Sequence, residues 1–388
     1  MRIAFVGLRN IGPAAAGGIE KAIEELSTRF VQAGHDVTVF CRARYDRNAG
    51  SHFKGVHLKP LPAIYTKHLE AISNTVAAIV CALRGYDIIH INATGPALLG
   101  FVPRLFRKHL VVTVHGLDWK REKWGTFAKL FLRLGARAAI AFPQRTVVVS
   151  QTLKSYYETR YHKRVTYIPN GVTLPAPAPS GRSRGLGLSP DDYILFLGRL
   201  VPEKGCHLLI EAFRRLDTPK KLVIVGAPSH SEDYANSLRE LAGTDPRIIF
   251  AGALFDDEKD MVYRNASLFA LPSTIEGMAL VLLEAMSYGK CCVCSDIEEN
   301  LEVIEPALPS AAAGAAPPAA SSSPPIGVRF RSEDVGDLAA TLQALLGDPA
   351  RVRAIGAQAH EHVARNFNWD RIAGQYLDLY RGLIAHEP

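Results

Sequence analysis

Apolar residues in the first part of the chain gather in short runs, and each run is followed by a longer stretch in which apolar positions recur at helical spacing. The runs read RIAFVG, DVTVF, YDIIHIN, LVVTVHG and RTVVVS. Runs of Val, Ile and Leu without polar alternation are typical of strands buried on both faces, and a helix between successive strands indicates parallel pairing. The pattern therefore predicts a doubly wound α/β domain at the N-terminal end.

The same alternation begins again after residue 190. Its strand-like runs are YILFL, KLVIVG, RIIFAG, SLFALPS and CCVCSD, and helical spacing appears in HLLIEAFRRL and YANSLRELAG. Because one hydrophobic core rarely extends beyond about 250–300 residues, a chain of 388 residues is expected to hold two domains. The predicted fold class is α/β, with two doubly wound Rossmann-like domains in series.

The domain boundaries follow from composition. Residues 170–190 are rich in Pro, Gly and Ser, which is typical of a linker. This places a first domain at 1–170, a linker at 171–190 and a second domain at 191–367. Residues 368–388 are predicted to form a final helix that packs back toward the first domain through one apolar face. That face comprises Ile372, Tyr376, Leu379 and Leu383.

One segment of the second domain has no core-forming pattern. Residues 306–325 read PALPSAAAGAAPPAASSSPP and contain neither a charged nor an aromatic residue. Such a stretch cannot bury enough apolar surface to offset the entropy lost on ordering. We predict a disordered surface insertion there.

The charge balance narrows the class of partner. Lys and Arg number 45 against 38 Asp and Glu, which gives a net charge of +7. A mildly basic protein suits anionic small molecules or a membrane surface, and the excess is small for a nucleic-acid-binding domain. Nucleic acid is therefore not an expected partner.

The cysteine pattern and the apolar runs favour a cytoplasmic protein. Three of the six cysteines lie in KCCVCSD, where the thiols alternate too tightly for zinc ligands, so a buried strand is expected. Nothing indicates a disulfide framework. No apolar run approaches the ~20 residues of a membrane span. The nearest candidate, at 71–85, is interrupted by Ser73, Asn74 and Thr75, and we predict an amphipathic core helix.

Candidate chemistry lies after the predicted strands, because ligands of open α/β sheets bind beyond the carboxyl ends of the strands. His115 follows LVVTV, Arg199 and Lys204 follow YILFL, and Glu276 follows SLFALPS. Glu276 and Glu284 flank the apolar run GMALVLL. Buried carboxylates are costly without a partner, so both glutamates are expected to bind something.

The order of these motifs resembles that of the retaining glycosyltransferases of family 4, which have the two-domain GT-B fold. The matching motifs are GG at 17–18, HG at 115–116, PNGV at 169–172, GRLVPEKG at 198–205 and EGMALVLLE at 276–284. The resemblance covers nearly the whole chain except the insertion. It implies two Rossmann-like domains facing a cleft. The stretch HGLDWKREKWG is similar to bacterial enzymes that build surface polysaccharides.

The residues themselves suggest how a nucleotide sugar would bind. We expect a helix to open at Gly277, so that its free N–H groups and dipole face a diphosphate, with Arg199 and Lys204 on the opposite loop. Glu276 is expected in the loop, where it reaches the sugar. Glu284 is expected just over one turn into the helix, where it reaches the ribose. No metal or other cofactor is needed in this arrangement.

The resemblance and the residues together predict transfer of a sugar from a nucleotide diphosphate sugar to a hydroxyl of a saccharide or lipid-linked acceptor, with retention of configuration. The predicted catalytic residues are His115 and Glu276. The predicted donor-binding residues are Gly17, Gly18, Arg199, Lys204, Gly277, Met278, Ala279, Leu280 and Glu284. The alternatives are a sugar-nucleotide isomerase or hydrolase, and a non-catalytic sugar-nucleotide-binding subunit.

Simpler interpretations of the individual residues stay open at this point. Glu276 is also a residue that a helix dipole favours, and Glu284 could pair with a structural Lys or Arg. His115 could be a buried core histidine. Gly17 and Gly18 could serve only a tight turn.

The segment from Asp118 to Ile140 combines cations with bulky apolar residues. Its basic residues are Lys120, Arg121, Lys123, Lys129, Arg133 and Arg137, and its apolar residues include Trp124, Phe127, Leu130, Phe131 and Leu134. Such a segment can rest on an anionic bilayer. We therefore consider peripheral binding to the inner membrane face; the alternative is a surface helix whose apolar side faces the core.

Overall fold

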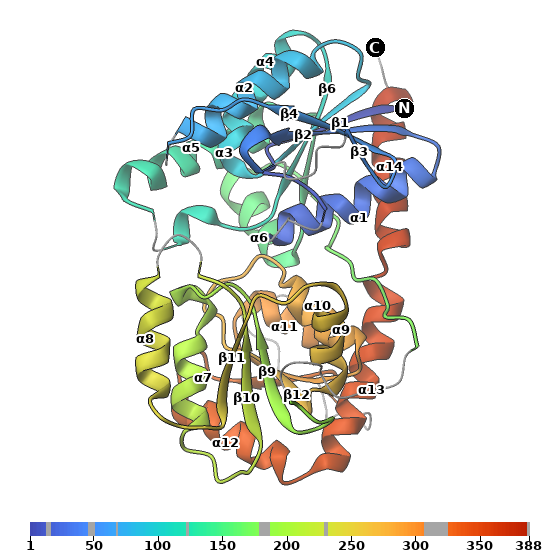
Figure 1. Ribbon diagram of the computed structural model, residues 1–388. Coiled ribbons are helices and arrows are strands. Elements are labelled where there is room, and N and C mark those ends of the chain that lie inside the picture. The colour runs from blue at the N-terminus through green and yellow to red at the C-terminus, as the bar shows by residue number, and fades with distance from the viewer. Residues whose placement is uncertain are drawn as a thin grey trace. The chain divides into compact units, whose positions relative to one another are not determined.

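The computed structural model describes residues 1–12, 17–45, 51–66, 69–121, 124–177, 187–228, 232–305 and 325–385 (Figure 1). The chain forms two compact units. Unit 1 comprises Met1–Gly171 and Trp369–Pro388, and unit 2 comprises Val172–Asn368. The insertion predicted at 306–325 lies outside the described residues except for its last position.

The described part of unit 1 contains an eight-stranded sheet in the order β3-β4-β2-β1-β5-β6-β7-β8. The strands are β1 Arg2–Val6, β2 Asp36–Arg42, β3 His52–Phe53, β4 Val56–Leu61, β5 Ile88–Asn92, β6 His109–Val114, β7 Arg145–Val148 and β8 Thr166–Tyr167. All neighbours pair in parallel except β3 and β4. The order reverses between β1 and β5, which makes that pair the switch point of a doubly wound sheet.

The helices of unit 1 follow its strands. They are α1 Gly18–Gln32, α2 Leu69–Ala82, α3 Thr94–Ala97, α4 Phe101–Leu105, α5 Thr126–Ala141, α6 Gln151–Tyr161 and α14 Trp369–Ala385. Helix α14 packs beside α1, where Arg29 Nε donates to Asp370 Oδ1 at 2.6 Å and the rings of Phe30 and Tyr380 meet edge to face (Figure 1). Of the apolar face predicted for α14, Leu379 alone is partly exposed.

Unit 2 contains a six-stranded parallel sheet among its described residues, in the order β11-β10-β9-β12-β13-β14. The strands are β9 Tyr193–Leu197, β10 Lys221–Val225, β11 Ile248–Gly252, β12 Leu268–Leu271, β13 Cys291–Ser295 and β14 Val328–Phe330. The helices are α7 Cys206–Phe213, α8 Asp233–Ala242, α9 Asp256–Asn265, α10 Leu280–Ser287, α11 Glu298–Ile304, α12 Val335–Leu346 and α13 Pro349–Asn366. This strand order places the switch point between β9 and β12.

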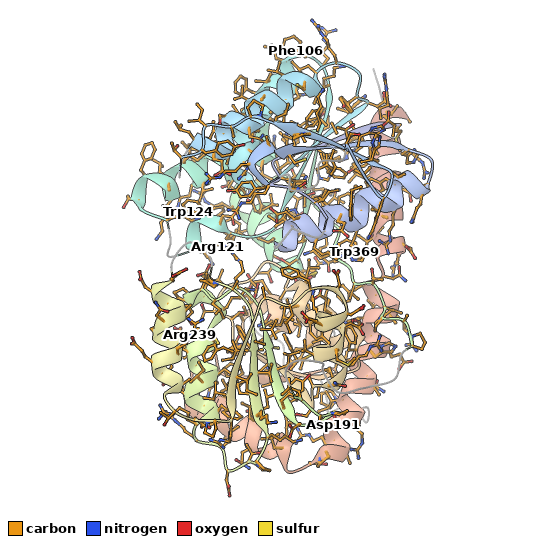
Figure 2. The ribbon with its side chains drawn as sticks, viewed as in Figure 1. Phe106, Arg121, Trp124, Asp191, Arg239 and Trp369 are labelled. Atoms are coloured by element: carbon orange, nitrogen blue, oxygen red, sulfur yellow. The ribbon has the colours of Figure 1, made fainter. Side chains whose placement is uncertain are left out.

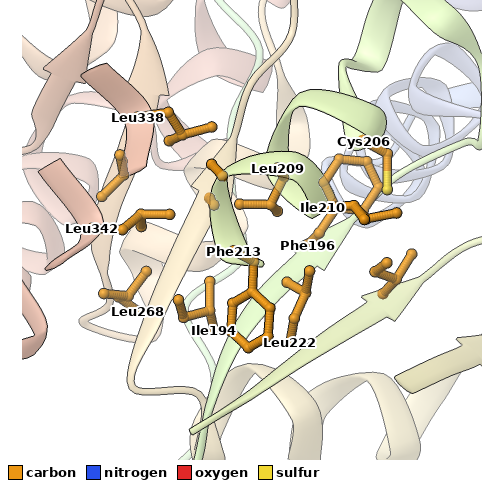
Figure 3. Close-up of a cluster of buried hydrophobic side chains, with 14 of the residues drawn as sticks. Ile194, Phe196, Cys206, Leu209, Ile210, Phe213, Leu222, Leu268, Leu338 and Leu342 are labelled. Atoms are coloured by element: carbon orange, nitrogen blue, oxygen red, sulfur yellow. The ribbon is translucent and has the colours of Figure 1, made fainter. Parts of the chain in front are cut away.

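One face of the unit 2 sheet carries a continuous apolar core (Figure 3). Ile194 and Phe196 of β9 meet Phe213 of α7 there, and α12 covers the neighbouring strands. The cysteine-rich run forms β13, which is buried along its whole length as predicted. Burial raises the pKa of Cys291 to about 12, so this thiol stays protonated.

The fold class predicted from the sequence is confirmed, and each predicted strand is present. Strands β3, β4, β8 and β14 were not predicted. Strand β4 contains Pro60 and alternating polar residues, and the other three are only two or three residues long, so none shows a run of buried apolar residues. No helix within the described ranges is long and apolar enough to cross a membrane.

Candidate active site

The loops after β9 and β12 meet at the switch point of the unit 2 sheet. A short 3₁₀ turn, Pro202–Lys204, follows β9 and ends at Gly205, whose φ is +66°. A Cβ on Gly205 would lie 2.0 Å from the carbonyl oxygen of Pro272, so only glycine allows this approach. Thr274 N donates to the Glu203 carbonyl oxygen at 3.0 Å and fixes the two loops together.

This contact brings Lys204 and Glu276 together. The Lys204 Nζ lies 2.5 Å from Glu276 Oε1, and the two side chains keep only 13% and 9% of their surface exposed. The sequence predicted these residues on opposing loops. The sequence did not predict that Lys204 is a partner of Glu276, and binding of ligand hydroxyls to this carboxylate stays a prediction.

Helix α10 begins at Leu280, three residues later than predicted. Gly277 and Met278 form a bend, and Ala279 is the N-cap in extended backbone conformation. No side chain caps this end, so its first N–H groups and its dipole remain for an anion. Glu276 lies in the preceding loop and Glu284 is the fifth residue of the helix, as the sequence predicted.

Glu284 has two protein partners on α9. Lys259 Nζ donates to its Oε1 at 2.8 Å, and the Tyr263 hydroxyl donates to its Oε2 at 2.9 Å. Burial and the nearby carboxylate raise the pKa of Tyr263 well above its ordinary value, so it remains a donor. The pairing of Glu284 with a structural lysine, left open by the sequence, therefore exists. Sequence reasoning missed Lys259 and Tyr263, although their spacing of four places them on one helix face.

Arg199 stands at the same edge of the sheet, directly after β9 and Gly198. The backbone there is fixed by β10, because Gly198 N donates to Val225 O at 3.0 Å. A Cβ on Gly226 would lie 1.9 Å from the Gly198 carbonyl oxygen. Arg199 is partly exposed and lies on the loop that carries Lys204.

In unit 1, His115 follows β6 at the carboxyl edge of the sheet. Its Nε2 is buried and has no hydrogen-bond partner among the described residues. Burial lowers the pKa of His115 to about 4, so the imidazole is neutral at neutral pH. A neutral ring with an unused nitrogen can form one hydrogen bond with a hydroxyl of a substrate.

Gly17 and Gly18 lie at the start of α1. Gly17 is its N-cap, with extended backbone and no side-chain cap, and Gly18 is its first residue. A Cβ on Gly17 would lie 2.0 Å from Glu20 Oε2. Absence of a side chain therefore lets the Glu20 carboxylate fold back over the helix end. Residues 13–16 of this loop lie outside the described ranges.

A buried polar network that the sequence did not reveal lies beside His115. His90 Nδ1 is 2.6 Å from the Tyr380 hydroxyl and His90 Nε2 is 2.7 Å from Thr113 Oγ1. The Tyr376 hydroxyl lies 3.4 Å from the same threonine oxygen. Burial, and secondarily His115, lower the pKa of His90 to about 3. The network connects α14 to β5 and β6, and its threonine on β6, Thr113, lies two positions before His115.

These two histidines predict a pH dependence of stability. Their folded-state pKa values lie below the unfolded value of about 6.5, so below that pH the unfolded chain binds more protons. Stability should fall from pH 6.5 toward pH 4, by up to about 1.4 kcal/mol per pH unit from each histidine. Urea unfolding of wild type and His90→Gln at several pH values measures this; equal slopes for the two proteins would contradict it.

Within the described ranges, no three His, Cys, Asp or Glu side chains are arranged to hold a metal ion. The charged groups gathered at the unit 2 switch point include the cations of Arg199, Lys204 and Lys259, two carboxylates and an uncapped helix end. That set suits a ligand with both a diphosphate and several hydroxyls, because cations and N–H groups bind phosphate oxygens and carboxylates accept from hydroxyls.

Comparison with known proteins agrees with this assignment. Residues 16–174 match the model of Glycosyltransferase Family 4, and residues 184–362 match that of Glycosyl transferases group 1. The chain belongs to this family of GT-B glycosyltransferases.

Relatives of the chain are similar over nearly its whole length. The D-inositol 3-phosphate glycosyltransferase of Gordonia bronchialis is 27% identical over 407 residues, which cover 95% of this chain and 84% of that protein. The alpha-maltose-1-phosphate synthase of Mycobacterium tuberculosis strain H37Rv is 26% identical over 414 residues, which cover 99% of this chain and 100% of that protein.

Solved structures share the fold. Sucrose-phosphate synthase from Thermosynechococcus elongatus superposes with a TM-score of 0.81 at 25% identity and covers 100% of both chains. Anabaena Alr3699/HepE in complex with UDP-glucose has a TM-score of 0.78 at 19% identity, covering 98% of this chain and 100% of that one.

Proposed function

We propose that the protein transfers a sugar, as a hexosyltransferase does, from a nucleotide diphosphate sugar to an acceptor hydroxyl. The transfer proceeds with retention of configuration and without a metal ion. The observation that carries the proposal is the Lys204–Glu276 pair at the switch point of unit 2, directly before the uncapped start of α10. A donor offers a partner to each member of the pair. The diphosphate replaces the carboxylate beside Lys204, and the sugar hydroxyls replace the ammonium beside Glu276.

Each residue of the site has a role in this scheme. Arg199, Lys204 and the residues from Gly277 to Leu280 hold the diphosphate and stabilise the charge that grows on it. Glu284, oriented by Lys259 and Tyr263, accepts from the ribose hydroxyls. His115 of unit 1 is assigned a hydrogen bond with the transferred sugar, through its buried Nε2. Gly17 and Gly18, at the start of α1, complete the proposed set of donor-binding residues.

The chemical step is an attack on the face of the sugar from which the diphosphate leaves. The bond between the anomeric carbon and the phosphate oxygen breaks, and the acceptor oxygen bonds to the same carbon. The acceptor proton passes to the departing phosphate oxygen. The cations around the diphosphate favour this path, because they stabilise the leaving group before a new bond is complete.

The acceptor in this proposal is a saccharide or a lipid-linked saccharide, and the product enters cell-surface polysaccharide. The stretch HGLDWKREKWG supports that context. The donor class is supported by HepE, whose structure contains UDP-glucose. The proposal of glycosyl transfer is also supported by the names of two relatives, D-inositol 3-phosphate glycosyltransferase and alpha-maltose-1-phosphate synthase.

Nucleotide binding with and without metal tests the donor site. Titration calorimetry with UDP, GDP, ADP and dTDP in EDTA should reveal one nucleotide that binds, and Mg²⁺ should change its Kd by less than about threefold, since protein cations already neutralise the diphosphate. Transfer should likewise persist in EDTA. Strict dependence of binding or turnover on Mg²⁺ would contradict the metal-free site.

Helix α5 supports the proposal that the protein also binds a membrane. It packs against the core of unit 1 through Leu132, Ala136 and Ala139. A second apolar stripe faces outward, with Phe127, Leu130 and Leu134 exposed by 82%, 55% and 43%.

The charges of this helix fit an anionic surface. Its sequence contains Lys129, Arg133 and Arg137 and no acidic residue. Phe106, after α4, adds a further exposed ring on unit 1 (Figure 2). Exposed apolar residues flanked by cations are the pattern of a helix that lies in a bilayer interface.

A sedimentation assay with anionic liposomes tests this binding. Arg133→Ser with Arg137→Ser should lower the bound fraction about tenfold or more at low salt, because each near-surface cation contributes about 1 kcal/mol. Arg351→Ser with Arg353→Ser, on α13 of unit 2, removes the same charge and should have little effect. Wild-type protein that stays in the supernatant would point to a soluble acceptor.

A further inference from the structure

Three loops at the carboxyl edge of the unit 1 sheet are joined to one another. They follow β1, β2 and β4, which are neighbours in the sheet. Arg42 N donates to Arg9 O at 2.9 Å, and Asn10 Nδ2 donates to Tyr45 O at 2.9 Å. Arg44 N donates to the Tyr65 hydroxyl at 2.9 Å. The loops therefore form one surface rather than three separate ones.

This surface is positively charged. The described loop residues 7–12, 42–45 and 62–66 include three arginines and no Asp or Glu. Arg42 is neutralised by Glu70, whose Oε1 lies 2.9 Å from its Nη1. Arg9 and Arg44 are exposed and form no ion pair with any residue that the structure describes. Two guanidinium charges thus remain for a ligand.

Both guanidinium groups are held by aromatic rings. The Cζ of Arg9 lies 5.7 Å from the centre of the Tyr45 ring, and that of Arg44 lies 5.5 Å from the centre of the Tyr65 ring. Stacking on a ring fixes the plane of a guanidinium and leaves its N–H edge available. That edge matches two oxygens of a phosphate group, which it binds in bidentate fashion.

The surface lies close to the place where the acceptor would react. Arg9 follows β1, which borders the switch point, and His115 follows β6 two strands away. Neighbouring strands of a sheet lie about 4.8 Å apart. The end of β1, which precedes Arg9, is therefore about 10 Å from the end of β6, and the end of β2, which precedes Arg44, is about 14 Å from it. Between them, Asn92 at the end of β5 is fully buried, and its Oδ1 has no partner among the described residues. A sugar at the switch point would place one end near Asn92 and His115 and the other near the arginines.

We propose that the acceptor carries a phosphate group, as a sugar phosphate or as a sugar on a lipid diphosphate, and that Arg9 and Arg44 bind this group. The inference rests on the proposed function, because it assigns the acceptor to unit 1. It makes the two arginines specificity residues for the acceptor. The donor diphosphate is assigned to other residues, Arg199 and Lys204 of unit 2.

Inorganic pyrophosphate is a probe for this site once the donor site has been filled. Wild-type protein is first saturated with the nucleotide diphosphate that it binds and is then titrated with pyrophosphate. Arg9→Gln with Arg44→Gln should weaken this second binding about 10- to 100-fold, as expected for charge-assisted contacts. Arg84→Gln with Arg145→Gln removes two exposed arginines at the opposite edge of the same sheet and should leave it unchanged.

The outcomes separate the two proposals. If no nucleotide diphosphate binds in the first titration, the proposed function fails. If the nucleotide binds but pyrophosphate does not, or binds the Arg9 and Arg44 variant equally well, the phosphate site fails and the donor site stands.

Nucleotide release in the presence of acceptors distinguishes the sources of phosphate. A hexose 1-phosphate, a hexose 6-phosphate and a sugar on a lipid diphosphate in liposomes are compared with the free hexoses. One of the phosphate-bearing acceptors should accelerate release at least tenfold more than its phosphate-free counterpart, and the double variant should lose that advantage. Equal stimulation by free hexose and by every phosphate form would overturn the inference.

Discussion

Replacing Lys204 by alanine is expected to weaken nucleotide diphosphate binding about 10- to 100-fold, because a charge-assisted contact contributes about 1.5–3 kcal/mol. Arg199→Ala should act in the same direction. Lys204→Ala should also destabilise the fold, since it leaves the Glu276 carboxylate, 9% exposed, without its ion pair. Breaking a buried pair costs about 3 kcal/mol or more. Calorimetry and urea unfolding measure the two effects separately.

A second ion pair of unit 2 provides the control for Lys204. Lys221 and Asp192 are 2.9 Å apart but keep 33% and 32% of their surface exposed. Lys221→Ala should cost no more than about 1 kcal/mol and leave nucleotide binding unchanged. Adding Glu276→Gln to Lys204→Ala should restore part of the lost stability, because it removes the unpaired charge. Wild-type affinity and stability in Lys204→Ala would show that the pair has neither role.

Replacing Glu276 by glutamine is expected to reduce turnover by about 100-fold or more while nucleotide affinity changes little. In the proposed mechanism Glu276 contacts the sugar, where charge develops during transfer, and loss of such a group lowers kcat. Glu284→Gln should instead weaken nucleotide binding about tenfold, because the ribose contact proposed for Glu284 would exist before and during the reaction. Steady-state kinetics and nucleotide titrations of both variants measure these effects.

A change at the partner of Glu284 sharpens this comparison. Tyr263→Phe removes the hydroxyl that donates to Glu284 Oε2 and keeps the ring that stacks on Tyr288 at 5.1 Å. Its effect on nucleotide affinity should be smaller than that of Glu284→Gln and should have the same sign. If nucleotide affinity falls more for Glu276→Gln than for Glu284→Gln, the two roles are reversed.

The positions of the site residues could be predicted because they depend on chain order. Runs of buried apolar residues reveal parallel strands, and the loops after those strands must share one edge of the sheet. Lys204 and Glu276 are 72 positions apart, yet both follow strands at the switch point, so their loops meet. Glu284 could likewise be placed in the helix from its distance to Glu276.

The partners of those residues could not be predicted, because they depend on side-chain geometry. The Lys204–Glu276 pair requires the close approach of Gly205 to Pro272, which no spacing in the sequence specifies. Lys259 and Tyr263 lie on α9, a polar helix whose sequence contains no motif that would mark them as partners of Glu284. In α5, large apolar residues occur on more than one face of the helix. Which of these faces is buried depends on packing, and in the structure Phe127, Leu130 and Leu134 face outward.

Consumption of a nucleotide sugar tests the central claim most directly. Purified protein is mixed in EDTA with UDP-, GDP-, ADP- and dTDP-sugars and with the free and phosphate-bearing sugar acceptors described above. NMR follows release of the nucleotide diphosphate and the anomeric configuration of the glycoside formed. We predict that one donor is consumed, that its configuration is retained and that Glu276→Gln slows the reaction by about 100-fold. A protein that binds none of these donors, or a product with inverted configuration, would contradict the account.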